Sequence, residues 1–320
     1  MPTRCPGPTR PCWVEIRAQA LEANFRFLKN LAGPDAELLA IVKADAYGHS
    51  LKACAPAVVC AGARWLGVTS VEEGAAARAL CPPAQSETQI LVIGGVFPGQ
   101  GAAVIEHRLT VVAWEPWQLD ELAAAARAAG LRPGALPIHL EIDTGMSRQG
   151  ASPSELAPVF ARFAPGSPLR LEGVMTHLFA ADEADGHVTE GQLARLEEAL
   201  SRISAAGLFG EWLNVGNSAA LLAGQAPAIA ELAGRHGMRA MMRPGLSLYG
   251  LVPRFNPEFA ATEPEPLTAA RASLQPVLGW KSEVVGVRSV AAGAVVGYNG
   301  TFVATEPMRL ALVAAGYGDG

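Results

Sequence analysis

The chain has 320 residues, half of them hydrophobic, so it can bury a large core and does not have the composition of a disordered protein. Its net charge is −5 and it has no dense block of lysine and arginine, which argues against a nucleic-acid surface. A small-molecule partner is the better expectation.

The first twelve residues are rich in proline and arginine but lack the apolar core of a signal peptide, and no later apolar stretch reaches membrane-spanning length. We therefore predict a cytoplasmic protein, not bound to a membrane, with a loose N-terminal tail over residues 1–12. Five cysteines without a C-x-x-C pair indicate neither a disulfide framework nor a zinc site.

Short β-like runs alternate with alanine-rich helical stretches from Trp13 onward, which is typical of βα units on a parallel sheet. The expected helices include residues 72–80, 116–129 and 190–206. The expected strands are residues 38–42, 65–69, 89–93, 109–113, 137–142, 171–176, 212–215 and 239–243. Eight such strands predict an α/β protein with a (β/α)8 TIM-type barrel, whose chemistry lies on the loops after the strands. A doubly wound sheet is the alternative, but no G-x-G-x-x-G follows an early strand.

The chain changes character after the barrel. We expect the barrel over residues 13–251, a proline- and glutamate-rich connector over 252–267, and a mainly β domain over 268–320. Because the sequence stops at Gly320 within that domain, we expect the domain to be incomplete.

Lys43 ends the apolar run of residues 37–42, in a chain with 4 lysines against 21 arginines. Burial at a strand end disfavours the charged amine, and a neutral amine can form a Schiff base, which arginine cannot do. The alternative is a lysine that snorkels to the surface.

Other polar residues also follow predicted strand ends, and together they mark one face of the barrel. Asn217 and Ser218 stand at a strand-to-helix junction, where a hydroxyl and backbone N–H groups can face an anion, although a plain helix cap has the same pattern. Gly245 lets the backbone approach a ligand. The remaining residues of this face are Tyr47, Arg148, His177 and Arg243.

Six segments resemble signature segments of alanine racemases, in the same order and at similar spacing. They are AIVKADAYGH at 40–49, DTGMSR at 143–148, THLFAADE at 176–183, NSA at 217–219, RPGLSLYG at 243–250 and GYGDG at 316–320. The resemblance covers the chain from residue 13 to its last residue. It implies a homodimer of barrel-plus-β-domain subunits that uses pyridoxal 5′-phosphate (PLP).

The resemblance also implies roles for single residues. Lys43 would hold PLP, while Tyr47, Ser218 and the Gly245 and Leu246 amides would hold its phosphate, with Asn217 beside them. Arg243 would contact the pyridine nitrogen, which leaves the cofactor a weaker electron sink than a carboxylate partner would.

Inversion of a stereocentre needs one base on each face. The resemblance implies Lys43 for D-alanine and Tyr317 of the other subunit for L-alanine. His177 would orient Arg243 and link to Tyr317, and Arg148 would approach the cofactor phenolate and the substrate carboxylate. The implied product, D-alanine, serves bacterial peptidoglycan.

The chain departs from the family at Glu141, where many members carry a carbamylated lysine. We expect the glutamate to supply a permanent negative charge that pairs with Arg148. Pro244 is a milder departure.

Alternatives to the alanine racemase are a broad-specificity amino-acid racemase, a related decarboxylase, and a truncated, inactive PLP-binding homologue. A metal site at His177, Asp182, Glu183 and His187 is disfavoured because Asp182 and Glu183 open a polar loop, and we predict no metal.

Overall fold

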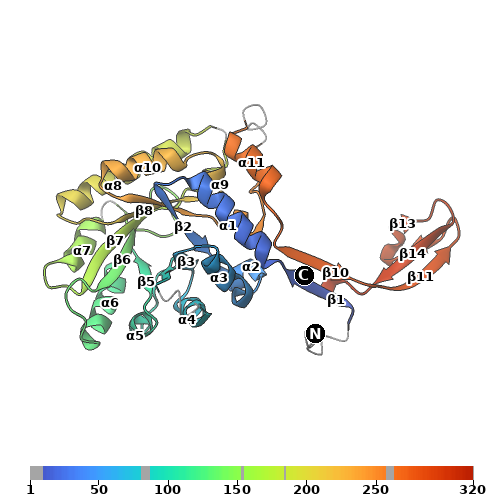
Figure 1. Cartoon of the computed structure of the whole chain (residues 1–320), viewed down its shortest axis with the longest axis horizontal. Coiled ribbons are helices and arrows are strands. Elements are labelled where there is room, and N and C mark those ends of the chain that lie inside the picture. The colour runs from blue at the N-terminus through green and yellow to red at the C-terminus, as the bar shows by residue number, and fades with distance from the viewer. Residues whose placement is uncertain (1–9, 81–86, 153–154, 184, 257–262, 320) are drawn as a thin grey trace. The chain divides into compact units, whose positions relative to one another are not determined.

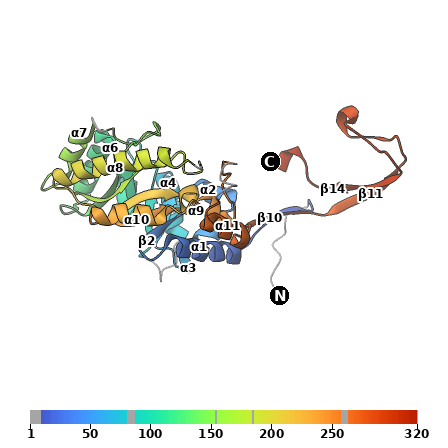
Figure 2. The same ribbon diagram turned by 90° about the horizontal axis from the view of Figure 1, so that it is seen from above.

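The computed structural model describes residues 10–80, 87–152, 155–183, 185–256 and 263–319. Contacts within the chain define two units: Arg17–Val277 is one, and Met1–Ile16 with Leu278–Gly320 is the other. Figures 1 and 2 show the helices of the larger unit around the outside of its strands.

The larger unit is a closed barrel of parallel strands in the order β2 to β9, with β9 pairing back to β2. This confirms the predicted (β/α)8 fold, and each predicted barrel strand overlaps an observed one. The strands are β2 (Ala36–Ile41), β3 (Trp65–Val68), β4 (Gln89–Val92), β5 (Thr110–Ala113), β6 (Leu136–Glu141), β7 (Leu169–Met175), β8 (Trp212–Asn217) and β9 (Arg239–Arg243).

Helices follow the strands and cover the barrel from outside, because strands buried on both faces need such a cover. They are α1 (Ala18–Ala32), α2 (Lys43–Gly48), α3 (Leu51–Cys60), α4 (Val71–Leu80), α5 (Gly101–Glu106), α6 (Pro116–Ala128), α7 (Leu156–Phe160), α8 (His187–Ala205), α9 (Ser218–Leu222), α10 (Ala226–Arg235) and α11 (Glu265–Ser273), with short 3₁₀ turns η3 (Ala161–Phe163) and η4 (Leu246–Tyr249).

One cluster of buried side chains fills part of the barrel, and every barrel strand except β6 contributes to it. The cluster contains Leu39, Ile41, Trp65, Leu91, Val112, Met175, Trp212 and Met241. Tyr47, in α2 after β2, and Ile93, directly after β4, pack against it. The core therefore supports the loops at the C-terminal ends of the strands, where the chemistry of such barrels lies.

The smaller unit is built from antiparallel strand pairs, which confirms the predicted mainly β character. The pairs are β1 (Cys12–Ile16) with β10 (Leu278–Ser282), β11 (Val284–Val290) with β14 (Met308–Val313), and β12 (Val295–Val296) with β13 (Phe302–Val303), accompanied by η6 (Tyr298–Gly300) and η7 (Tyr317–Asp319).

Two expected segments lie partly outside the described residues. Residues 1–9 of the expected tail lie outside them, and Cys12 already belongs to β1. Residues 257–262 of the expected connector also lie outside. Helix α11 then extends to Ser273, beyond the expected start of the β domain at residue 268, because it buries Leu267 and Ala270 and has proline in its first turn.

No helix in the described segments is long and apolar enough to cross a bilayer. The same segments contain no group of three or more metal-ligating side chains placed to hold an ion.

Candidate active site

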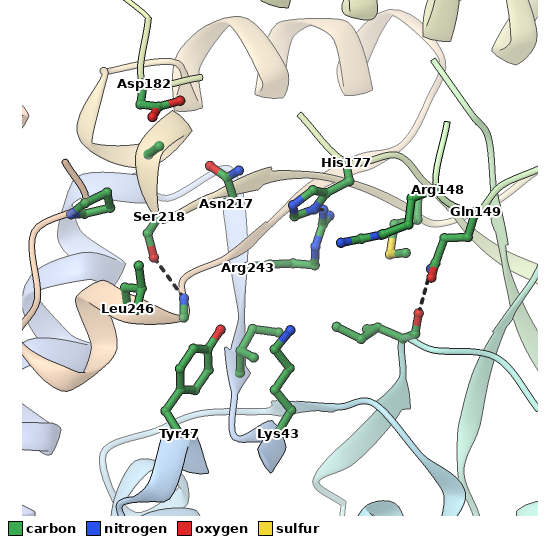
Figure 3. A pocket seen from close by; sticks show the side chains of 16 residues that line it. Lys43, Tyr47, Arg148, Gln149, His177, Asp182, Asn217, Ser218, Arg243 and Leu246 are labelled. Atoms are coloured by element: carbon green, nitrogen blue, oxygen red, sulfur yellow. Dashed lines mark hydrogen bonds between the residues drawn. The ribbon is translucent and has the colours of Figure 1, made fainter. Parts of the chain in front are cut away.

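A pocket of about 300 Å³ opens at the C-terminal ends of the barrel strands. It brings together nine of the ten predicted site residues, and Figure 3 shows the side chains of all of them except Gly245. The nine are Lys43, Tyr47, Arg148, His177, Asn217, Ser218, Arg243, Gly245 and Leu246. The tenth, Tyr317, belongs to the smaller unit, where its side chain is 98% exposed.

The backbone directly after Lys43 is left-handed over four residues, from Ala44 to Tyr47, with φ between 50° and 57°. Such a conformation costs about 1–2 kcal/mol per residue for L-amino acids. Glu73 offsets part of this cost by accepting from the Ala44 amide at 2.6 Å, and the Asp45 carboxylate accepts from the Leu51 amide at 2.6 Å. The turn directs both Lys43 and Tyr47 into the pocket.

The Lys43 amine is half-buried. Burial lowers the pKa of Lys43 below its ordinary value, the positive charge of Arg148 lowers it further, Glu73 opposes these effects, and Arg243 adds a smaller lowering. A lysine in this setting deprotonates more readily than one in water, as a nucleophilic amine must.

The Arg243 guanidinium is buried on the opposite side of the pocket. Its NH1 donates to the backbone oxygen and the Oδ1 of Asn214 at 2.7 and 2.6 Å, and its NH2 donates to the Thr176 oxygen at 2.8 Å. Burial lowers the pKa of Arg243 to about 10, while Glu141 raises it and Arg148 lowers it. Arg243 therefore stays charged near neutral pH. Its Nε makes none of these bonds and can donate a hydrogen bond to a ligand.

His177 contacts Arg243 through its Nδ1, which lies 3.0 Å from NH2. Because a guanidinium can only donate, Nδ1 must accept, and the proton of the neutral ring lies on Nε2. Burial lowers the pKa of His177 to about 3, with further lowering by Arg243, Arg148 and Lys43. His177 is thus a neutral group whose Nε2–H can donate to a further partner.

Ser218, Tyr47 and Gly245 form the other end of the pocket. Ser218 Oγ accepts from the Gly245 and Ser247 amides at 2.9 and 3.3 Å. A Cβ placed on Gly245 would lie 2.4 Å from the Tyr47 hydroxyl, so that hydroxyl sits directly above the glycine backbone. Burial raises the pKa of Tyr47, which keeps its hydroxyl protonated and able to donate.

Asn217 stands at the N-cap of α9, where its Oδ1 accepts from the Ala220 amide at 2.9 Å and its Nδ2 donates to the Leu178 oxygen at 3.0 Å. Its side chain is thus committed to holding the backbone that presents Ser218. Leu246 is the first residue of η4 and is 40% exposed at the pocket edge.

Glu141 does not form the expected pair with Arg148: within the described residues no ion pair joins them. Its Oε2 accepts from Gln149 Nε2 instead, at 2.5 Å. Burial raises the pKa of Glu141 to about 7, against lowering by Gln149, Arg243 and Arg148 and a small raising by Asp143. Because burial disfavours the charged form, this carboxyl is only partly ionised near neutral pH and does not carry the full negative charge that was expected.

Sequence reasoning missed several residues that support the site. Asn214 and Thr176 hold Arg243, Glu73 holds the strained turn, and Gln149 holds Glu141. Asn214 carried a signal, since it is a polar residue inside an otherwise apolar strand and needs a buried partner. Glu73 gave none, because a glutamate in the first turn of a helix is normally explained by the helix itself.

Two regions of the chain match known family descriptions. Residues 16–253 match "Alanine racemase, N-terminal domain" and residues 277–320 match "Alanine racemase, C-terminal domain". The chain belongs to the alanine racemase family. This confirms the resemblance found in the sequence, and the family is one of isomerases that use PLP.

Individual relatives agree with this membership. The alanine racemase of Symbiobacterium thermophilum is 35% identical over 314 residues, covering 97% of this chain and 75% of the relative. That of Streptomyces coelicolor is 34% identical, covering 96% and 74%. The crystal structure of alanine racemase from Streptomyces lavendulae, a D-cycloserine producer, superposes with a TM-score of 0.81 at 33% identity, covering 98% of this chain and 76% of that one. The chain thus spans about three quarters of these alanine racemases.

Proposed function

We propose that this chain binds PLP covalently through Lys43 and interconverts L- and D-alanine by a two-base mechanism, with Lys43 and Tyr317 as the bases. The observation that carries the proposal is the Lys43 amine, whose pKa is lowered by burial, in one pocket with a buried Arg243 and a hydroxyl-lined end. A broad-specificity amino-acid racemase remains the second candidate.

The residues present fit PLP at each of its polar groups. The Lys43 amine suits the aldehyde, and the Ser218 and Tyr47 hydroxyls with the Leu246 amide suit the phosphate. The Gly245 amide is already bonded to Ser218, so it would hold the phosphate indirectly. Arg243 Nε suits the ring nitrogen, and the positive charges of Arg148, Arg243 and Lys43 favour an anionic ligand overall.

When bound, PLP would supply an electron sink that acidifies the Cα–H of an amino acid condensed with it. Arg243 would keep its own proton and so leave the ring nitrogen unprotonated, which limits how much charge the sink takes up. Lys43 would remove or deliver a proton on one face of Cα. Arg148 would orient the substrate carboxylate, and His177 would hold Arg243 through its unprotonated Nδ1.

Tyr317 would serve the opposite face of Cα from the second subunit of a homodimer. Two observations support this: Tyr317 is almost wholly exposed in its own unit, and that unit carries many exposed apolar side chains, as an interface does. They include Val284, Val285, Val287, Val295, Phe302, Leu312 and Val313.

The covalent link is tested by reducing the PLP-treated protein with borohydride and mapping the modified peptide by mass spectrometry. We expect the pyridoxyl group on Lys43 and a yellow protein before reduction. The other lysines, Lys29, Lys52 and Lys281, are internal controls, since a label on any of them in place of Lys43 would contradict the assignment.

Gly245→Ala tests the hydroxyl end of the pocket. The new Cβ would displace the Tyr47 hydroxyl, which lies 2.4 Å away, and so remove a hydrogen bond to the phosphate. A hydrogen bond to a charged group contributes about 1.5–3 kcal/mol, so we expect PLP affinity to fall at least about tenfold in an absorbance titration. Gly234→Ala in α10 is the matched control, because a Cβ there meets nothing within 4 Å. Equal affinities of the two variants would argue against Tyr47 as a phosphate ligand.

A further inference from the structure

Arg148 is positioned without a partner for its own side chain. Its guanidinium makes no hydrogen bond or ion pair in the described part of the chain, and the residue is exposed, yet it lines the pocket. Its position must therefore come from the loop that carries it, which runs from β6 to residue 151.

That loop is closed on itself. The Asp143 amide donates to the Ala151 oxygen at 3.1 Å, and the Ala151 amide donates to the Glu141 oxygen at 2.8 Å. Inside the loop, Asp143 Oδ1 accepts from the Gly145 and Ser147 amides at 2.9 and 3.1 Å. These bonds give the loop a fixed shape but, being internal, do not tie its tip to the barrel.

Gln149 supplies a tie at the tip. Its Nε2 donates to the Ile93 oxygen at 3.1 Å, just beyond β4, and to Glu141 Oε2 at 2.5 Å, at the end of β6. Figure 3 shows Gln149 beside Arg148 at the pocket, with one hydrogen bond of Gln149 dashed. One amide thus spans two strand ends and immobilises the residue directly after Arg148. On the other side of the loop, Arg195 Nε donates to the Thr144 oxygen at 2.6 Å.

We propose that Gln149 is a positioning residue, which uses Glu141 and the Ile93 carbonyl as anchors to hold the Arg148 guanidinium over Lys43. The inference rests on the proposed function in one respect, which is that Arg148 would bind the substrate carboxylate. The arrangement itself is a property of the protein without cofactor or substrate.

The consequence is measurable at Lys43. After burial, Arg148 is the largest cause of its lowered pKa, with Glu73 raising it and Arg243 lowering it. The other groups facing the amine are the Tyr47 ring, whose centroid lies 5.9 Å from Nζ, and the neutral His177. If Gln149 no longer holds the loop, Arg148 moves away and the Lys43 amine retains its proton to higher pH.

The test uses cofactor-free protein and an amine-acylating reagent, with the acylation rate of Lys43 followed against pH by peptide mass spectrometry. We expect Gln149→Met to slow acylation on the rising limb of the pH profile by about threefold, because the pKa of Lys43 rises, and Arg148→Gln should do the same. In the double variant Gln149→Met/Arg148→Gln we expect no further slowing beyond Arg148→Gln alone. Gln89→Met, at the exposed start of β4, is the matched control and should acylate like the wild type.

Gln149→Ala makes the same break without adding bulk and should give the same profile. An unchanged Lys43 profile in both Gln149 variants, while Arg148→Gln shifts it, would overturn the proposal. The proposal would also be overturned if adding Gln149→Met to Arg148→Gln slowed the acylation of Lys43 as much as Gln149→Met does alone. Gln149 would then act on Lys43 without Arg148. Neither PLP nor alanine is present, so the outcome is independent of the borohydride test of the proposed function.

Discussion

Relative to a Glu141→Gln variant, the wild-type chain should lose about 3 kcal/mol of unfolding free energy as the pH rises from about 4.5 to about 8. The expectation follows from the pKa of Glu141, which burial raises from 4.5 to about 7. A carboxyl whose pKa is raised by folding stabilises the native state below its unfolded pKa, and this contribution is lost as the pH passes its folded pKa. Glutamine cannot titrate, so the variant lacks this loss.

The measurement is urea unfolding of both chains at a series of pH values, with the difference between them plotted against pH. Glu155→Gln is a control of opposite sign, because hydrogen bonds from Ser152 lower the pKa of the exposed Glu155. The stability that Glu155 contributes in the wild type is present above its unfolded pKa and is lost as the pH falls. Parallel stability curves for the wild type and Glu141→Gln would show that Glu141 is not the buried, proton-holding group described here.

The barrel could be predicted from the sequence because its signals are local and repeated. Apolar runs of four to seven residues separated by helical stretches fix the strands, and closure follows from their number. The gathering of Lys43, His177 and Arg243 could be predicted for the same reason, since residues that follow parallel strands share one end of a barrel.

What the sequence did not reveal are conformations and pairings set by tertiary contacts. The left-handed turn from Ala44 to Tyr47 contains no glycine until Gly48, so nothing local announces it. It exists because distant groups such as Glu73 hold it. The Glu141 partner was misjudged for a related reason: charge alone favours Arg148, but the folded loop brings the amide of Gln149 closer.

The largest expected effect on activity concerns the sharing of Lys43 and Tyr317 between subunits. Lys43→Ala and Tyr317→Ala homodimers should each be inactive, because each lacks one of the two bases. A purified mixed dimer of the two chains, isolated through different tags, should regain one complete site and about half of the wild-type activity. Alanine racemisation followed by polarimetry is the measurement.

A reciprocal control separates sharing from its alternative. A mixed dimer of the wild-type chain with a Lys43→Ala/Tyr317→Ala chain places one defect in each shared site, so it should be inactive if Tyr317 acts across the interface. If Tyr317 acts within its own chain, the same dimer retains one intact site, while the mixed dimer of single variants has none. The two dimers contain the same two substitutions, on separate chains in one dimer and on a single chain in the other, so a difference in their activity can only come from how Lys43 and Tyr317 are distributed. Activity in the wild-type/double-variant dimer alone would show that both bases come from one subunit.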